Sequence, residues 1–231
     1  MDSWIKIASA AVPGGDTELT LLQRNDDFAI RISGLPGDLM NSRMYHSEEA
    51  LAELGCTRLS IVENARILVG GLGMGFTLAA ALRIVPGSAE VIVAELVPAV
   101  VEWNRGPLGQ CAGRPLDDGR TRVHLGDVVA LLKRQEKKFD AILLDVDNGP
   151  EAMTASANGW LYTRGGLKQI YEKLRPEGIV AIWSVRADQQ FTSRLRKTGF
   201  KVQARTVRAR PGKGSRHTIF VAQKPRVSST R

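Results

Sequence analysis

The sequence predicts an α/β fold: a doubly wound, mostly parallel sheet of seven strands, preceded by a small antiparallel β unit. Three observations predict it. From residue 65 onward, short apolar runs alternate with helical segments, which is typical of βαβ units in a parallel sheet. The first of these runs leads into a glycine-dense turn at residues 70–75. The N-terminal segment instead alternates apolar and polar positions around turn-forming residues, as half-exposed antiparallel strands do.

Residues 1–46 are predicted to form the antiparallel unit. Its expected parts are strands at 18–23 and 28–32, the hairpin signal Asn25-Asp26-Asp27 between them, and a short third strand at 39–42. An amphipathic helix is expected from Ser47 to about Cys56. Ser47 is the predicted N-cap, because serine is favoured there and acidic residues follow it in the first turn.

Residues 47–224 are predicted to form the main domain, and residues 225–231 a basic tail. Strands are expected at 65–70, 90–95, 121–125, 139–145, 178–184, 200–208 and 217–223. Helices are expected near 75–84, 97–105, 127–135, 164–174 and 189–198. The last two strands are joined by Pro211-Gly212-Lys213-Gly214-Ser215, so they form a hairpin that completes a sheet of five parallel strands.

The composition is that of a soluble enzyme. A chain of 231 residues suits one α/β domain with an appendage. The longest uncharged apolar run, residues 67–82, is too short and too rich in glycine to span a bilayer, so no membrane partner is expected. Cys56 and Cys111 form no disulfide framework, and the three histidines are widely separated, so we expect no metal. Reduced cysteines and the lack of a signal-peptide pattern favour a cytoplasmic location.

The charge is concentrated at the C-terminal end. The net charge is +8, and no acidic residue follows Asp188, although Lys and Arg recur from Arg194 to Arg231. One interpretation is a surface for nucleic acid or another polyanion. The other is a sheet edge whose lysines and arginines prevent pairing with other strands. We favour the charged edge, because few aromatic side chains stand between these charges to stack on bases.

Residues 66–95 are the most informative stretch: a strand, a glycine loop, a helix and a second strand that ends on Glu95. This order is typical of the nucleotide-binding half of a Rossmann-like sheet. The spacing Gly71-x-Gly73-x-Gly75 differs from the dinucleotide pattern, which needs a glycine where Phe76 stands. It matches class I S-adenosylmethionine-dependent transferases, so the sequence predicts a sulfonium nucleoside as co-substrate.

Acidic residues follow three of the predicted parallel strands: Glu95, Asp127, and Asp145 with Asp147. Ligands of open α/β sheets bind outside the carboxyl ends of the strands, so these side chains are expected to meet at one rim. Glu95 is suited to accept hydrogen bonds from a ribose diol, and Asp127 from an adenine amino group. For Asp127, a helix N-cap is a serious alternative. Asp145 is predicted to face the reacting carbon.

The ordered set GGLGMG, AELVPAVVEWNR, HLGDVVALL, FDAILLDVDNGPE and LYTRGGLKQIYEKLRPEGIVAIWS resembles the spermidine synthase family over roughly residues 17–185. The resemblance implies a class I methyltransferase-like domain behind an N-terminal β-hairpin unit. It also implies a donor nucleoside, S-adenosylmethionine or its decarboxylated form, a small amine as acceptor and a homodimer.

The resemblance implies roles for single residues. Glu95 matches the acid that holds the donor ribose, and Asp127 the acid at the adenine end. Asp145 matches the first Asp of the family's Asp-rich loop, where it helps to deprotonate and orient the attacking amine. Tyr162 stands where an aromatic residue borders the acceptor channel. From their place beyond the fourth parallel strand, Asp147, Asn148 and Glu151 are predicted to bind the acceptor.

One departure from the family leaves the transferred group open. The family's glycine loop carries an Asp that grips the donor's aminopropyl ammonium, and here Gly73 or Met74 takes its place. The leading hypothesis is aminopropyl transfer onto a small amine. The main alternative is a small-molecule methyltransferase that uses intact S-adenosylmethionine. An RNA methyltransferase and a non-catalytic nucleoside-binding module are weaker alternatives.

Overall fold

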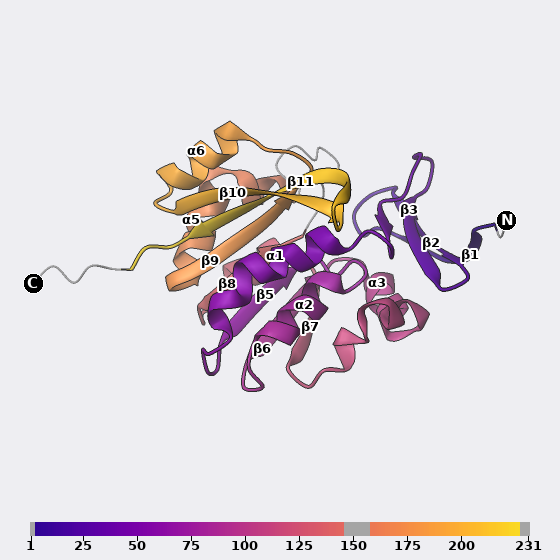
Figure 1. Ribbon diagram of the computed structural model, residues 1–231, viewed down its shortest axis with the longest axis horizontal. Helices are drawn as coiled ribbons and strands as arrows, with labels where there is room; N and C mark the ends of the chain where they lie inside the picture. The colour runs from indigo at the N-terminus through magenta and orange to yellow at the C-terminus, as the bar shows by residue number, and fades with distance from the viewer. Residues whose placement is uncertain (1–2, 146–157, 227–231) are drawn as a thin grey trace, which may run out of the picture.

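The computed structural model describes residues 3–145 and 158–226, and this part of the chain forms two sheets (Figure 1). A four-stranded antiparallel sheet has the order β1-β2-β3-β4. A seven-stranded sheet has the order β10-β11-β9-β8-β5-β6-β7. The predicted fold class is therefore confirmed, including the small N-terminal β unit. Within the described residues, no helix is both long and apolar enough to cross a membrane.

The N-terminal sheet has one strand more than the sequence predicts. Its strands are β1 (Ile5–Ala11), β2 (Glu18–Arg24), β3 (Asp27–Ile32) and β4 (Met40–Asn41). The hairpin between β2 and β3 is confirmed, with Arg24 paired to Asp27 and Asn25 at a φ of 54° in the turn. β1 was missed because both of its faces are largely exposed, so it lacks the apolar alternation of a half-buried strand.

The seven-stranded sheet follows the predicted order of elements. Its strands are β5 (Arg66–Gly70), β6 (Glu90–Glu95), β7 (Thr121–Leu125), β8 (Phe139–Leu144), β9 (Leu174–Ser184), β10 (Lys201–Arg210) and β11 (Lys213–Gln223). The first five are parallel to one another, and β11 pairs antiparallel with both β9 and β10. The carboxyl ends of the five parallel strands consequently share one edge of the sheet.

Helices cover both faces of this sheet (Figure 1). They are α1 (His46–Cys56), α2 (Phe76–Ile84), α3 (Pro98–Arg105), α4 (Val128–Arg134), α5 (Arg164–Lys173) and α6 (Gln189–Lys197). Short 3₁₀ turns lie at Thr57–Leu59, Pro107–Ala112, Pro115–Asp117 and Asn158–Tyr162. Alternate residues of β5 enter the two cores: Ile67 and Val69 pack with α1, α2 and α3, and Leu68 with α4, α5 and α6.

Two boundaries differ from the predictions. β9 begins at Leu174 rather than at residue 178, and its register against β8 shifts between Phe139 and Ala141. The Pro-Glu-Gly sequence thus makes an irregularity inside a strand, not the turn before it. The N-cap of α1 is Tyr45, so the prediction of Ser47 as the cap is wrong. Ser47 lies inside the helix, and its hydroxyl donates to the neighbouring Glu48.

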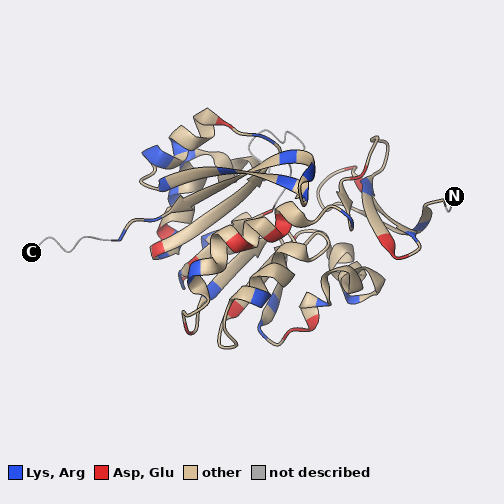
Figure 2. Cartoon of the chain, viewed as in Figure 1, with Lys and Arg blue, Asp and Glu red and all other residues tan. Residues whose placement is uncertain are grey.

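The Lys and Arg residues from Arg194 to Arg216 lie on α6 and on the β10–β11 hairpin (Figure 2). β10 is the outer strand at one end of the sheet, and its Lys201 and Arg205 are exposed. This placement agrees with the interpretation of a charged sheet edge. The four-stranded sheet ends at Asn41 and α1 begins at His46. The domain boundary at residue 46 stays a prediction.

Candidate active site

The glycine loop lies between β5 and α2 at the carboxyl edge of the sheet. Gly71, Gly73 and Gly75 have φ values of 88°, 52° and 85°, which side-chain-bearing residues rarely adopt. A Cβ on Gly75 would stand 3.1 Å from both Asn104 Oδ1 and Pro115 Cγ. Asn104 Nδ2 also donates to the Gly73 carbonyl at 2.8 Å. The loop is therefore held close against α3 and the segment after it, in a conformation that requires glycine.

Glu95 ties the end of β6 to this loop. Its two carboxylate oxygens accept the backbone N–H groups of Leu72 at 2.9 Å and of Val97 at 2.8 Å. Burial raises the pKa of Glu95, and these backbone hydrogen bonds act in the opposite direction. Each carboxylate oxygen can accept a second hydrogen bond, so the fixed side chain can also receive the hydroxyl groups of a ribose. The predicted ribose-binding role of Glu95 stays a proposal.

Asp127 occupies the position that the sequence left open between two roles. It is the N-cap of α4, and its Oδ1 accepts the Val129 N–H at 2.8 Å. The capping alternative is thus confirmed. A capping carboxylate still has hydrogen-bonding capacity, and Gly126 beside it donates to the Glu95 carbonyl at 2.8 Å. Asp127 is therefore next to the end of β6, where the proposed adenine contact remains a prediction.

Asp145 follows β8 and shares a cavity with Glu48 of α1. Burial raises the pKa of Asp145 to about 6, against a hydrogen bond of 2.9 Å from Thr77 Oγ1 that lowers it. Burial and the nearby Asp145 charge raise the pKa of Glu48 to about 7, against a hydrogen bond from Ser47. Two carboxyl groups in one partly buried place cannot easily both be charged, so the cavity favours a cation between them.

The cavity has a volume of about 140 Å³, and residues from both the N-terminal β unit and the main domain line it. Its lining residues are Leu39, Met40, Asn41, Glu48, Leu72, Gly73, Met74, Phe76, Thr77, Asp145 and Trp183. Met40 of β4 packs on the glycine loop, since a Cβ on Gly73 would stand 3.0 Å from Met40 Sδ. A whole small-molecule ligand needs about 300–1,000 Å³, so this space suits one arm of a ligand rather than all of it.

Several predicted residues do not meet in this cavity. Tyr162 is only 5% exposed, and its ring packs edge-on against Phe191 with 5.6 Å between the centroids. It belongs to the core on the α4–α6 face and does not line the cavity that the described residues form. Asp147, Asn148 and Glu151 lie outside the described residues, so their acceptor-binding roles remain predictions.

Sequence reasoning missed most of the residues that line the cavity, among them Met40, Glu48, Thr77 and Trp183. The sequence pattern places Glu48 among the first-turn acids of a helix. Its place at the head of α1 gives no sign that the fold brings Asp145, from the end of β8, beside it. Thr77 carries one usable signal, because it follows the glycine loop directly and so starts at the ligand edge of α2.

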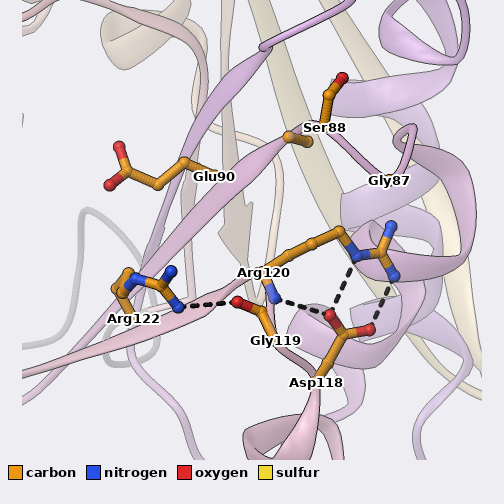
Figure 3. Close-up of a pocket in the computed structure, with 8 residues that line it drawn as sticks. Gly87, Ser88, Glu90, Asp118, Gly119, Arg120 and Arg122 are labelled. Carbon is orange, nitrogen blue, oxygen red and sulfur yellow. Dashed lines mark hydrogen bonds and ion pairs between the residues drawn. The ribbon is translucent and has the colours of Figure 1, made fainter.

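A second hollow lies at the opposite edge of the sheet (Figure 3). It is lined by Ser88, Glu90, Asp118, Arg120 and Arg122, near the amino ends of β6 and β7. Arg120 and Asp118 pair with each other at 2.7 Å, and Arg122 donates to the Gly119 carbonyl at 2.7 Å. Glu90 pairs with Arg66 outside the hollow, so each of these charges already has a partner within the protein. Ligands of such sheets bind at the other edge, so we assign no site here.

The strand order, the glycine loop and the acids at the strand ends define a class I methyltransferase-like fold. Residues 44–204 match the family model of the spermine/spermidine synthase domain. The chain therefore belongs to the spermine/spermidine synthase family, as the sequence motifs predicted.

Two curated relatives match about half of the chain. A polyamine aminopropyltransferase of Sulfolobus acidocaldarius is 28% identical over 120 residues, which are 52% of this chain and 38% of that protein. Polyamine aminopropyltransferase 2 of Pseudomonas aeruginosa is 34% identical over 124 residues, which are 52% of this chain and 33% of that protein. The match thus spans less than half the length of either relative.

Solved structures show the same fold. The spermidine synthase of Thermotoga maritima has a TM-score of 0.72 at 18% identity, and the match covers 95% of this chain and 72% of that one. A spermidine synthase in complex with the transition state analogue AdoDATO has a TM-score of 0.70 at 17% identity, with the same coverage. At this identity the similarity establishes the fold alone.

Proposed function

We propose that the protein transfers an aminopropyl group from decarboxylated S-adenosylmethionine to a small amine. The observation that carries the proposal is the cavity in which Glu48 and Asp145 stand beside the glycine loop. The names of the curated relatives, polyamine aminopropyltransferases, support the same reaction.

Glu48 supplies a carboxylate in place of the Asp that the family's glycine loop carries and this loop lacks. The glycine loop has no carboxylate, but Glu48 of α1 lines the same cavity as Gly73 and Met74. A donor arm that ends in an ammonium group would neutralise the two carboxylates. Intact S-adenosylmethionine would bring a third carboxylate to the same place, where like charges repel. The cavity therefore favours the decarboxylated donor and disfavours methyl transfer.

The chemistry needs alignment and one deprotonation. The amine nitrogen attacks the carbon next to the sulfonium, a C–N bond forms, and the C–S bond breaks to release a neutral thioether. Holding the two reactants in line can supply about 7–11 kcal/mol of the barrier reduction. An amine acceptor is protonated at neutral pH, so it must first lose a proton. Asp145, with a pKa raised to about 6, is close to the value that suits a general base.

The other predicted residues complete the proposal. Gly71, Gly73 and Gly75 cradle the donor arm, Glu95 binds the ribose and Asp127 the adenine. On the acceptor side, the sequence predicts Asp147, Asn148, Glu151 and Tyr162, and of these the described Tyr162 would act only through packing. A homodimer and a cytoplasmic location belong to the same proposal and rest on the family resemblance and the cysteine content.

The test is a transfer assay with both donors and a panel of linear diamines, analysed by mass spectrometry. We expect an aminopropylated amine and methylthioadenosine from the decarboxylated donor, and Asp145→Asn should lose most of this activity. The matched control is Asp140→Asn at the other end of β8, whose carboxylate pairs with Arg175. A methylated product formed from intact S-adenosylmethionine would instead establish the alternative function.

A further inference from the structure

A chain of hydrogen bonds connects Glu48 with the surface of the β10–β11 hairpin. Ser47 Oγ donates to Glu48 Oε2 at 2.6 Å. The same oxygen of Ser47 lies 3.2 Å from His217 Nδ1, and His217 Nε2 lies 2.9 Å from Ser215 Oγ. Ser47 is 1% exposed, whereas Ser215 is exposed. A polar path therefore leads from a carboxyl group of the cavity to solvent.

The fold positions this path from elements that are far apart in the sequence. His217 stands on β11 opposite Val207 of β10, and α1 packs against both strands. The Trp183 ring, which lines the cavity, meets the His217 ring edge-on with 4.6 Å between centroids. The imidazole is thus fixed between α1 and β9, and it is not a free surface side chain.

The charges around the path are those of the cavity itself. Glu48 lies on the path, and the charges of Glu49 on α1 and of Asp145 after β8 act on it; Glu49 also pairs with Arg83 at 2.6 Å. Arg208 and Arg216 stand opposite each other in the β10–β11 ladder, one residue along from His217. Because alternate residues of a strand point to opposite faces, these two arginines point away from the face that carries His217. Burial lowers the pKa of His217. The imidazole is therefore neutral at neutral pH and has a lone pair that can accept a proton.

The proposed reaction releases one proton per turnover. The acceptor ammonium gives up a proton before its nitrogen attacks, and the product nitrogen, with its new carbon substituent, is again an ammonium. When the product leaves, that first proton passes from Asp145 to Glu48, the neighbouring acid of the cavity with the higher pKa, and it must reach solvent before the next cycle.

Resting on the proposed function, we propose that Ser47 and His217 carry this proton from Glu48 to solvent. The Glu48 carboxylic acid passes its proton to Ser47 Oγ while the Ser47 hydroxyl proton moves to His217 Nδ1. The imidazolium then releases its Nε2 proton toward Ser215 and water. The ring now carries its proton on Nδ1, and exchange with water returns it to the Nε2–H tautomer before the next cycle. No group is oxidised or reduced. His217 is in this sense a positioning residue, because it acts on the reaction only through Glu48.

The test uses Ser47→Ala, His217→Gln and the double variant, with kcat and KM followed between about pH 6 and 9. Each single variant should lower kcat by about tenfold with little change in KM, and the double variant should lose no more. Imidazole added to a His217→Ala protein should restore part of kcat. Arg205→Gln on the same hairpin and Ser60→Ala are the controls that should keep wild-type values.

The inference is overturned by a Ser47→Ala protein with wild-type kcat at every pH, by single losses that multiply in the double variant, or by a His217→Ala protein that imidazole does not rescue. A purely structural role of His217 would lower kcat without imidazole rescue. If the wild type transfers nothing, the proposed function fails first. The path is then tested by NMR on the ligand-free protein, where Glu48→Gln must lower the titration midpoint of His217, and an unchanged midpoint contradicts it.

Discussion

Glu48 of α1 and Asp145 at the end of β8 line the same cavity, where burial and the Asp145 charge raise the pKa of Glu48 to about 7. Repulsion between these two acids lowers the stability of the ligand-free protein. The same pair gives a binding advantage to any ligand that brings a positive charge. We therefore expect the stability of the empty protein and its affinity for a cationic ligand to change in opposite directions.

The stability of the ligand-free protein should fall as the pH rises toward neutral because of these two acids. The pKa values of Glu48 and Asp145 are raised from 4.5 and 3.8 to about 7 and about 6. Between these limits the folded state binds more protons than the unfolded state, so the unfolding free energy decreases with increasing pH. Thermal unfolding at about pH 5 and pH 8 measures the difference. The difference in stability between the two pH values should be smaller in Glu48→Gln and unchanged in the exposed control Glu53→Gln.

Replacement of Glu48 should lower the affinity for the donor and raise the stability of the ligand-free protein. Glu48→Gln removes one of two like charges, so we expect the empty protein to gain roughly 1–2 kcal/mol at pH 8. Affinity for the decarboxylated donor should fall at least tenfold. Calorimetric titration and thermal unfolding of the same preparation check both effects. A variant that loses stability and keeps its affinity would show that Glu48 has a packing role only.

Gly75→Ala should disturb the loop and the donor site together. Gly75 has a φ of 85°, and an added Cβ would stand 3.1 Å from Asn104 Oδ1 and from Pro115 Cγ. We expect a loss of about 2 kcal/mol in unfolding free energy, from backbone strain and crowding. Gly87→Ala is the matched control, because a Cβ added to Gly87 would have no neighbouring atom within 4 Å. Equal melting temperatures for the two variants would contradict the account of the loop.

Thr77→Val should move the pH dependence of catalysis upward. The Thr77 hydroxyl donates to Asp145 Oδ2 at 2.9 Å and lowers the pKa of that carboxyl group. Without it the pKa of Asp145 rises further, so the general base becomes available only at higher pH. The acidic limb of the kcat profile should shift to higher pH in Thr77→Val and stay in place in Thr206→Val. An unshifted limb would exclude Asp145 as the titrating base.

The sequence predicted most of the fold because its local signals agreed with one another. Buried β-strands such as β5 and β8 are short apolar runs, and the glycine loop marks the start of α2. The sequence did not predict β1, because a strand exposed on both faces has no alternation of apolar and polar residues. The predicted start of β9 was wrong because Pro and Gly, usual turn residues, here form an irregularity that the neighbouring β8 accommodates.

The candidate site was predicted only in part. Glu95 and Asp145 follow directly from the rule that ligands bind at the carboxyl ends of strands. Glu48, Ser47 and His217 follow from no local rule, because their contacts join α1 to β8 and β11 across the tertiary structure. Ser47 was predicted as a cap from composition, whereas the packing of α1 on the hairpin turns its hydroxyl to a histidine 170 residues away.

The most direct test of the central claim is calorimetric titration of the wild-type protein with intact and with decarboxylated S-adenosylmethionine under identical conditions. The carboxylate pair Glu48 and Asp145 predicts that the decarboxylated donor binds at least tenfold more tightly. Tighter binding of intact S-adenosylmethionine would contradict an ammonium-binding cavity and would leave methyl transfer as the function of this fold.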